Sequence, residues 1–209
     1  MYEGLLTFAP PRIDLLLPHG NWTVPPPLRT PGDPGTPYAD WLIPIFDRWY
    51  DSPACRTDIR LFSSIISLLL GGPSTAESVG LDPINYVTVE TDGAIEQSDA
   101  LKTVAEGAAA TGLTVFGNSF DEVLEHPAIR SQRAGAASLC ASCRNCRLVR
   151  VCGGGLHAHR FSEATGFANP TVYCADQQAL IDHIRARVLA DLERIRPNRA
   201  AAATVSGSE

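Results

Sequence analysis

The chain has 209 residues, enough for one domain or two, and its 44% hydrophobic and 19% charged composition excludes disorder as the main state. Its 17 Lys and Arg against 23 Asp and Glu give a net charge of -6, so it lacks the basic footprint of a nucleic-acid-binding protein. No targeting signal opens the sequence, and its longest apolar run, 65–70, is too short to cross a bilayer. We therefore expect a cytoplasmic protein without nucleic-acid or membrane partners, whose clustered cysteines hold metal more readily than they form disulfides.

The first half of the chain predicts one strand and two helices. Prolines enclose the short apolar run 12–17, which is typical of a buried strand in a parallel sheet covered on both faces. Residues 38–50 carry apolar side chains at helical spacing, with Pro44 placed to kink the helix. Residues 61–70 predict a second helix, which a glycine pair and a proline end.

The middle of the chain predicts a hairpin followed by helices. Polar and apolar residues alternate up to the turn signal Asp92-Gly93, so residues 86–98 predict a β-hairpin. The Ala-rich segment 100–110 predicts a helix, and residues 119–125 predict another.

The C-terminal part predicts an amphipathic helix over 177–195, because leucine, isoleucine and valine recur there at helical spacing. The segment from Pro197 to Glu209 is small and polar, and we expect a disordered tail there.

The cysteines are the most informative feature. Four of the six fall within residues 140–152, and Cys143 and Cys146 form a CxxC knuckle, a spacing at which two thiolates reach one metal centre without backbone strain. Cys152 and Cys174 could complete a set of four.

The residues next to these cysteines suit a bulky, negatively charged centre. Gly153, Gly154 and Gly155 have no Cβ, so the backbone can approach an iron–sulfur cluster closely and donate N–H hydrogen bonds to its sulfurs. Four thiolates around an oxidised four-iron cluster leave roughly two net negative charges. Four nearby arginines could offset them: Arg144, Arg147, Arg150 and Arg160.

Two other interpretations of the cysteines remain open. Four thiolates also suit a tetrahedral structural zinc ion, and the thiols could be buried and unmodified. Cys140 could replace one of the four ligands, because Cys140 and Cys143 also form CxxC. The isolated Cys55 is expected to be a small buried residue.

The sequence resembles the SPASM region of radical S-adenosylmethionine (SAM) peptide maturases, specifically those of the FxsB type. The resemblance covers nearly all of residues 1–190. Four stretches carry it: Ile13-Asp14-Leu15-Leu16-Leu17-Pro18-His19, Val89-Glu90-Thr91-Asp92-Gly93 with Asp99-Ala100-Leu101-Lys102, Val151-Cys152-Gly153-Gly154-Gly155-Leu156, and Phe167-Ala168-Asn169-Pro170-Thr171-Val172-Tyr173-Cys174-Ala175-Asp176.

Two cysteine positions of the family's pattern hold other residues in this sequence. SPASM regions commonly carry CxxCxxxxxCxxxC preceded by Gly-x4-Cys, but here Leu156 and Ser98 stand at two of the cysteine positions. The missing positions are those of the first auxiliary cluster in two-cluster relatives. The retained set matches the second auxiliary cluster, so the resemblance implies one [4Fe–4S] cluster on four cysteines: Cys143, Cys146, Cys152 and Cys174.

The larger departure is the absence of CxxxCxxC, the motif that holds the SAM-cleaving cluster. The chain therefore resembles the C-terminal part of such an enzyme and is not expected to cleave SAM by itself. SAM is implied as a cofactor only if the missing N-terminal half is supplied. The implied partner is a ribosomally made precursor peptide. The missing half could be a radical SAM protein acting in trans, or it could belong to this chain if the gene is truncated or its start is mis-called.

Several polar residues are candidates for substrate contact. In sulfatase-maturing relatives a carboxylate after the lost cysteine is a candidate base, and Asp99 matches it by position; a solvated hairpin carboxylate is the alternative. His157 and His159 could contact cluster sulfur or substrate, and on a strand their spacing would place them on opposite faces. His19, with Asn21 and Trp22, could line a substrate opening or pack as a loop.

We therefore expect an α+β fold. Residues 1–85 would be the remnant of a partial radical SAM barrel, 86–190 a SPASM-like iron–sulfur module, and 191–209 a helix end and disordered tail. The expected function is cluster binding within a peptide-modifying radical SAM system. The alternative is a zinc-stapled, non-enzymatic module that binds a peptide or partner.

Overall fold

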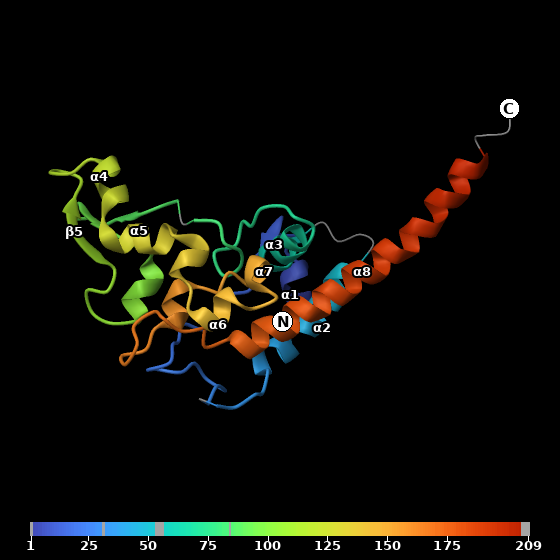
Figure 1. The fold of residues 1–209 in the computed structure, drawn as a ribbon, viewed down its shortest axis with the longest axis horizontal. Helices are drawn as coiled ribbons and strands as arrows, with labels where there is room; N and C mark the ends of the chain where they lie inside the picture. Colours follow the sequence, from blue (N-terminus) through green and yellow to red (C-terminus); the bar gives the residue numbers. More distant parts are fainter. Residues whose placement is uncertain (1, 31, 53–56, 84, 206–209) are drawn as a thin grey trace.

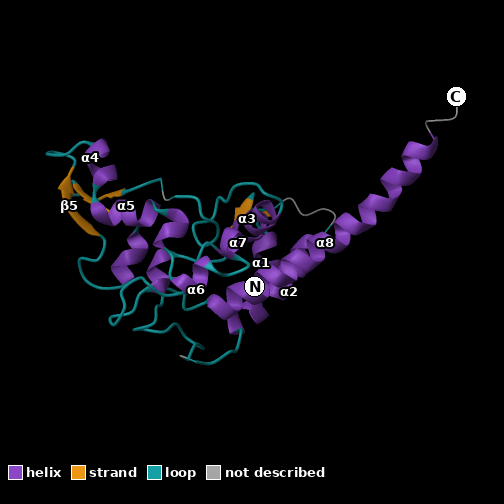
Figure 2. Cartoon of the chain, in the orientation of Figure 1, coloured by secondary structure: helices purple, strands orange, loops and turns teal. Residues whose placement is uncertain are grey.

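The fold combines helices with two small sheets, as expected for the α+β class, and the computed structural model describes residues 2–30, 32–52, 57–83 and 85–205 (Figures 1 and 2). The α-helices are α1 (Tyr2–Leu6), α2 (Pro37–Tyr50), α3 (Arg60–Leu69), α4 (Phe120–Glu125), α5 (Pro127–Arg133), α6 (Ala141–Arg144), α7 (Val149–Cys152) and α8 (Cys174–Val205). Three 3₁₀ helices are η1 (Asp99–Thr103), η2 (Gly135–Ser138) and η3 (His157–Arg160). The strands are β1 (Arg12–Ile13), β2 (Asp58–Ile59), β3 (Thr88–Val89), β4 (Ala94–Glu96) and β5 (Ala110–Thr114).

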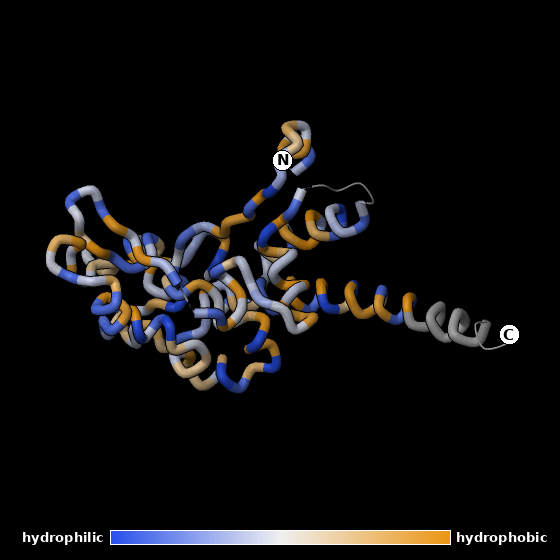
Figure 3. Tube along the Cα trace, turned by 90° about the horizontal axis from the view of Figure 1, so that it is seen from above, coloured by the Kyte–Doolittle hydropathy of each residue, from blue (hydrophilic) through white to orange (hydrophobic). Residues whose placement is uncertain are grey.

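The main core lies where α2, α3 and α7 pack against α8. The predicted helices 38–50 and 61–70 are confirmed as α2 and α3, and Pro44 lies inside α2. Figure 3 shows hydrophobic residues among hydrophilic ones along the coloured part of α8. Its core-facing side chains are Leu180, Ile181, Ile184 and Val188.

The predicted parallel pairing is confirmed, but the strand is shorter than 12–17. β1 pairs with β2 over two residues, Arg12 with Asp58 and Ile13 with Ile59. The pairing stops because α3 begins at Arg60, directly after β2, so the rest of the apolar run has no partner strand. Leu16 is accordingly 75% exposed.

The second sheet contains the predicted hairpin and one strand that the sequence did not indicate. β3 and β4 pair antiparallel, and β5 adds to β4 with Ile95 opposite Leu113. The helix expected over 100–110 is wrong: η1 ends at Thr103, and β5 begins at Ala110. Pairing with β4 overrides the helix propensity of the alanines, because it covers Ile95 beside the buried Val123.

The helix expected over 119–125 is confirmed as α4. A reciprocal capping box stabilises its start, with the Ser119 side chain accepting from the Glu122 N–H and the Glu122 side chain accepting from the Ser119 N–H. At the other end of the chain, α8 runs to Val205, into the segment expected to be disordered. Four consecutive alanines, 200–203, favour helix there. No helix within the described ranges is long and apolar enough to cross a membrane.

Candidate functional site

The fold brings the clustered cysteines together from two parts of the chain. Cys143 lies on α6, Cys146 follows it, Cys152 ends α7, and Cys174 begins α8. The Cys143 thiol interacts electrostatically with those of Cys140, Cys152 and Cys174, and Cys174 in turn with Cys146. Among the described residues, no group of three or more His, Cys, Asp or Glu side chains is arranged to hold a metal ion. Cys55 lies outside the described residues.

Burial and mutual proximity set the protonation of these thiols. Burial raises the pKa of Cys143 to about 12, and the neighbouring thiols add to this rise. Burial likewise raises the pKa of Cys152 to about 11, although a hydrogen bond from the Gly154 backbone opposes it. For Cys140, burial also raises the pKa, but hydrogen bonds involving Ser142 and Cys143 outweigh it and leave the pKa lowered.

Hydrogen-bond donors surround the sulfur atoms. The Leu148 N–H donates to Cys146 Sγ at 3.5 Å, and Gln178 Nε2 donates to Cys174 Sγ at 3.3 Å. Together with the Gly154 backbone, these donors are of the kind that stabilises thiolate ligands of a metal centre.

The three glycines are required by the protein's own packing. Gly153, Gly154 and Gly155 have φ of 61°, 80° and 72°, a left-handed conformation that side chains disfavour. A Cβ on Gly153 would lie 1.6 Å from the Gly80 carbonyl oxygen, and one on Gly154 would lie 2.7 Å from Leu139 Cδ2. We expected the glycines to let the backbone approach a cluster closely. In the structure they also let the backbone approach neighbouring protein atoms.

Arg160 places a buried positive charge beside the thiols. Its guanidinium donates to all three glycine carbonyls: Nε to Gly154 at 3.0 Å, and Nη2 to Gly153 at 2.9 Å and Gly155 at 2.8 Å. Burial lowers the pKa of Arg160, whereas the charges of Cys143 and Cys152 raise it.

Two of the other three arginines of this group have different partners. Arg147 forms an exposed ion pair with Asp182, and the Arg144 side chain donates to the Leu139 carbonyl. Arg160 is therefore the buried guanidinium of the site, and the fold gives it the charge-offsetting position that we expected of all four arginines.

The fit of an iron–sulfur centre rests on this donor set. Four thiols, N–H donors to three of their sulfurs, and one buried cation have the chemistry that a negatively charged thiolate-bound cluster needs. The residues present therefore have the donor chemistry of the group, although the described side chains are not arranged as a metal site.

A cavity of about 320 Å³ adjoins the thiols, between the segment after β1, α3 and the start of α8. His19, Asp99 and His159, three candidates for substrate contact, all line it. Gln177 connects the two sites, because it lines the cavity while Cys152 Sγ donates to its Oε1 at 3.1 Å.

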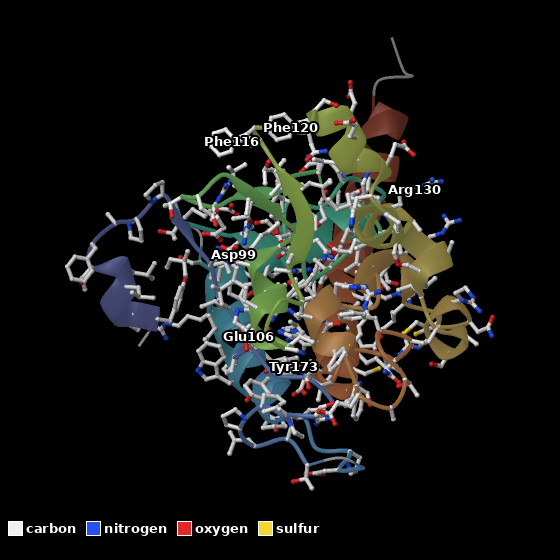
Figure 4. All side chains as sticks on the ribbon, turned by 90° about the vertical axis from the view of Figure 1, so that its left-hand side faces the viewer. Asp99, Glu106, Phe116, Phe120, Arg130 and Tyr173 are labelled. Carbon is white, nitrogen blue, oxygen red and sulfur yellow. The ribbon has the colours of Figure 1, made fainter. Side chains whose placement is uncertain are left out.

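Asp99 lies at the exposed mouth of this cavity. Its side chain is 73% exposed, and its Oδ1 accepts from Thr88 Oγ1 at 3.1 Å. In Figure 4 Asp99 lies apart from the exposed rings of Phe116 and Phe120, which project at the far end of the sheet. The position is accessible to a substrate and also to water.

The two histidines after the glycines lie on η3, so the expectation that they sit on opposite faces of a strand is wrong. The segment just before α8 contacts this turn, because the Val172 N–H donates a hydrogen bond to the His159 carbonyl. His159 is buried against Tyr173, with 5.0 Å between ring centroids, whereas His157 stacks on Phe167 at 4.1 Å.

Asn21 and Trp22 pack as a loop and do not line the cavity. Asn21 Oδ1 accepts from the Thr23 and Val24 backbones, and Trp22 Nε1 donates to the Pro170 carbonyl at 2.7 Å.

Sequence reasoning missed two residues at the start of α8. Asp176 Oδ1 accepts from the backbone N–H groups of Tyr38 at 2.9 Å and Ala39 at 3.1 Å, at the start of α2. Gln177 Nε2 donates to the Ser78 carbonyl at 3.2 Å. Both roles depend on contacts between the first turn of α8 and distant segments, which the sequence does not show. The sequence indicates these residues only by their position within three residues of Cys174.

No family model and no curated protein matches this chain. Solved structures do, among them structures of anSMEcpe. "Native anSMEcpe with bound AdoMet" shares 20% identity at a TM-score of 0.61, covering 73% of this chain and 41% of that one. "Native anSMEcpe with bound AdoMet and Cp18Cys peptide" shares 20% identity at 0.62, covering 75% and 43%. The chain therefore has the fold of part of anSMEcpe and spans about two fifths of its length.

Proposed function

We propose that this chain is the cluster-binding, SPASM-like part of a radical SAM peptide-modifying enzyme of the FxsB type. Four cysteines would hold one [4Fe–4S] cluster: Cys143, Cys146, Cys152 and Cys174. The observation that carries the proposal is the gathering of these thiols, together with that of Cys140, beside the buried Arg160. Support comes from the likeness in fold to anSMEcpe, whose structures contain AdoMet and peptides.

The residues around the thiols have defined parts in this proposal. When bound, the cluster would supply one-electron transfer. Arg160 and the sulfur-directed N–H groups offset its negative charge, while Gly153, Gly154 and Gly155 let the backbone turn closely enough to present those donors.

The division of the chain follows from the same proposal. Residues 1–85 would be the barrel remnant, with β1 and β2 as its parallel strands, and residues 86–190 the SPASM-like module. Because the sequence has no CxxxCxxC motif, SAM cleavage would require a radical SAM half, either as a separate protein in trans or as part of a longer chain.

The cavity is the proposed place for a side chain of the peptide. Asp99 stands at its mouth, where its carboxylate could accept a proton from the substrate. Replacing Asp99 by Asn keeps the hydrogen bond from Thr88 within reach and removes the base. Peptide modification by the complete system should then be lost while the metal content stays unchanged.

The decisive experiment is anaerobic purification with iron, sulfide and zinc quantified beside a visible spectrum. We expect about four irons and four sulfides per chain, as a [4Fe–4S] cluster requires. Cys143→Ala should lose them, and Cys140→Ala, a matched change three residues away, should retain them. One zinc without sulfide would refute the cluster and favour the zinc-stapled binding module.

A further inference from the structure

Two buried polar atoms on residues that line the cavity have no hydrogen-bond partner in the described part of the chain. They are His159 Nε2 and Asp176 Oδ2, on residues that are 4% and 2% exposed. Buried polar groups are normally paired, so each unpaired atom requires an explanation. Because both residues line the same cavity, one ligand group could satisfy both atoms.

The cavity separates these atoms from solvent by apolar walls. Its mouth carries exposed residues such as Leu16, Tyr86 and Asp99. Its interior is lined by buried aliphatic side chains: Leu42, Ile65, Leu180 and Ile181. A side chain that enters from the mouth therefore needs a long apolar body and a polar tip. A serine or threonine hydroxyl is too close to its backbone to meet this requirement.

The charges around the polar pair favour a neutral tip. Asp176 already accepts two N–H groups at the start of α2, and Arg29 Nη1 lies 3.6 Å from its Oδ2. A lysine ammonium placed there would be repelled by Arg29. His159 is neutral at physiological pH, because burial lowers its pKa to about 4.

We propose that the cavity binds a tyrosine side chain of the peptide. The phenol O–H would donate to Asp176 Oδ2, and its oxygen would accept from His159 Nε2–H, while the ring packs against the aliphatic walls. The inference rests on the proposed function only for the assumption that the tyrosine belongs to a peptide substrate.

The test uses small molecules that copy single side chains, on the full chain as purified. The probes are p-cresol for tyrosine, toluene for phenylalanine and n-butylamine for lysine, with binding measured by NMR titration. We expect p-cresol to bind at least tenfold more tightly than toluene, because a site built for a hydroxyl rejects the analogue that lacks it. n-Butylamine should bind more weakly than either.

Two matched variants separate the hydrogen bond from the packing. His159→Phe keeps a ring beside Tyr173 but removes Nε2, and should reduce the preference for p-cresol over toluene at least threefold. His157→Phe changes the same residue type on the same turn, stacked on Phe167 outside the cavity, and should leave the preference unchanged. Asp176→Asn is less informative, because Asp176 also holds the start of α2.

Equal binding of p-cresol and toluene, tighter binding of n-butylamine, or an unchanged preference in His159→Phe would overturn the inference. The preference compares two probes on the same protein, so it can be measured whether or not iron is bound. A zinc protein that prefers p-cresol would refute the proposed function alone, and an iron–sulfur protein without that preference would refute this inference alone.

Discussion

Gly153 provides a test of how tightly the loop after α7 packs. In Gly153→Ala the new Cβ would lie 1.6 Å from the Gly80 oxygen and 2.4 Å from its carbonyl carbon. These are backbone atoms, and the Gly80 N–H is itself bonded to the Val151 carbonyl at 2.8 Å, so no side-chain rotation can relieve the overlap. We expect a cost of about 1–2 kcal/mol for the left-handed conformation and a further ~3 kcal/mol for overpacking.

Gly166 supplies the control for the first of these costs. Its φ of 59° matches the 61° of Gly153, but an added Cβ would meet nothing within 4 Å. Gly166→Ala should therefore lose only about 1–2 kcal/mol. For a chain of this size, the difference between the variants corresponds to a Tm lower by roughly 9 °C in Gly153→Ala, measurable by anaerobic thermal unfolding. Equal Tm values in the two variants would refute the close approach to Gly80.

Three further predictions follow from named contacts. Arg160→Met should lower the free energy of unfolding by at least about 3 kcal/mol, because the carbonyls of three glycines lose their charged donor. A denaturant titration measures this loss, and a value below about 1 kcal/mol would show that Arg160 does not stabilise the glycine loop. Ser119→Ala should cost about 1 kcal/mol, because the capping box with Glu122 is broken, and full stability in that variant would argue against the box. Burial lowers the folded-state pKa of His159 to about 4, so the unfolded chain binds this proton first. The contribution of His159 to stability should fall by about 2.4 kcal/mol between pH 7 and pH 4.5, in addition to that of His157, whose pKa is also lowered to about 4. His159→Phe should lack its own part of the loss, and an identical pH profile in that variant would refute the prediction.

The sequence predicted best where local pattern and tertiary structure agree. α2, α3 and α8 follow apolar periodicity, and the hairpin follows Asp92-Gly93. β5 was missed because its alanines favour helix locally, whereas pairing with β4 is a long-range effect. β1 was overestimated for a similar reason, since its length depends on how soon α3 follows β2.

The candidate site divides in the same way. Spacing and resemblance pointed to four cysteines, because a CxxC knuckle is a local signal, and the fold brings Cys140 close to them as well. The cavity could not be predicted, since it depends on distant segments meeting. No sequence pattern shows that Asp176 will cap α2 or that His159 will lack a partner for Nε2.

The first turn of α8 touches every part of the site. Cys174 is one of the gathered thiols, Asp176 holds the start of α2, and Gln177 contacts both Cys152 and the cavity. A metal on the thiols and a ligand in the cavity would therefore act on one rigid element. Any coupling between them must be reciprocal: the factor by which metal changes ligand affinity equals the factor by which ligand changes metal affinity. A factor above one would make substrate help to retain the metal, whereas a factor below one would make each weaken the binding of the other.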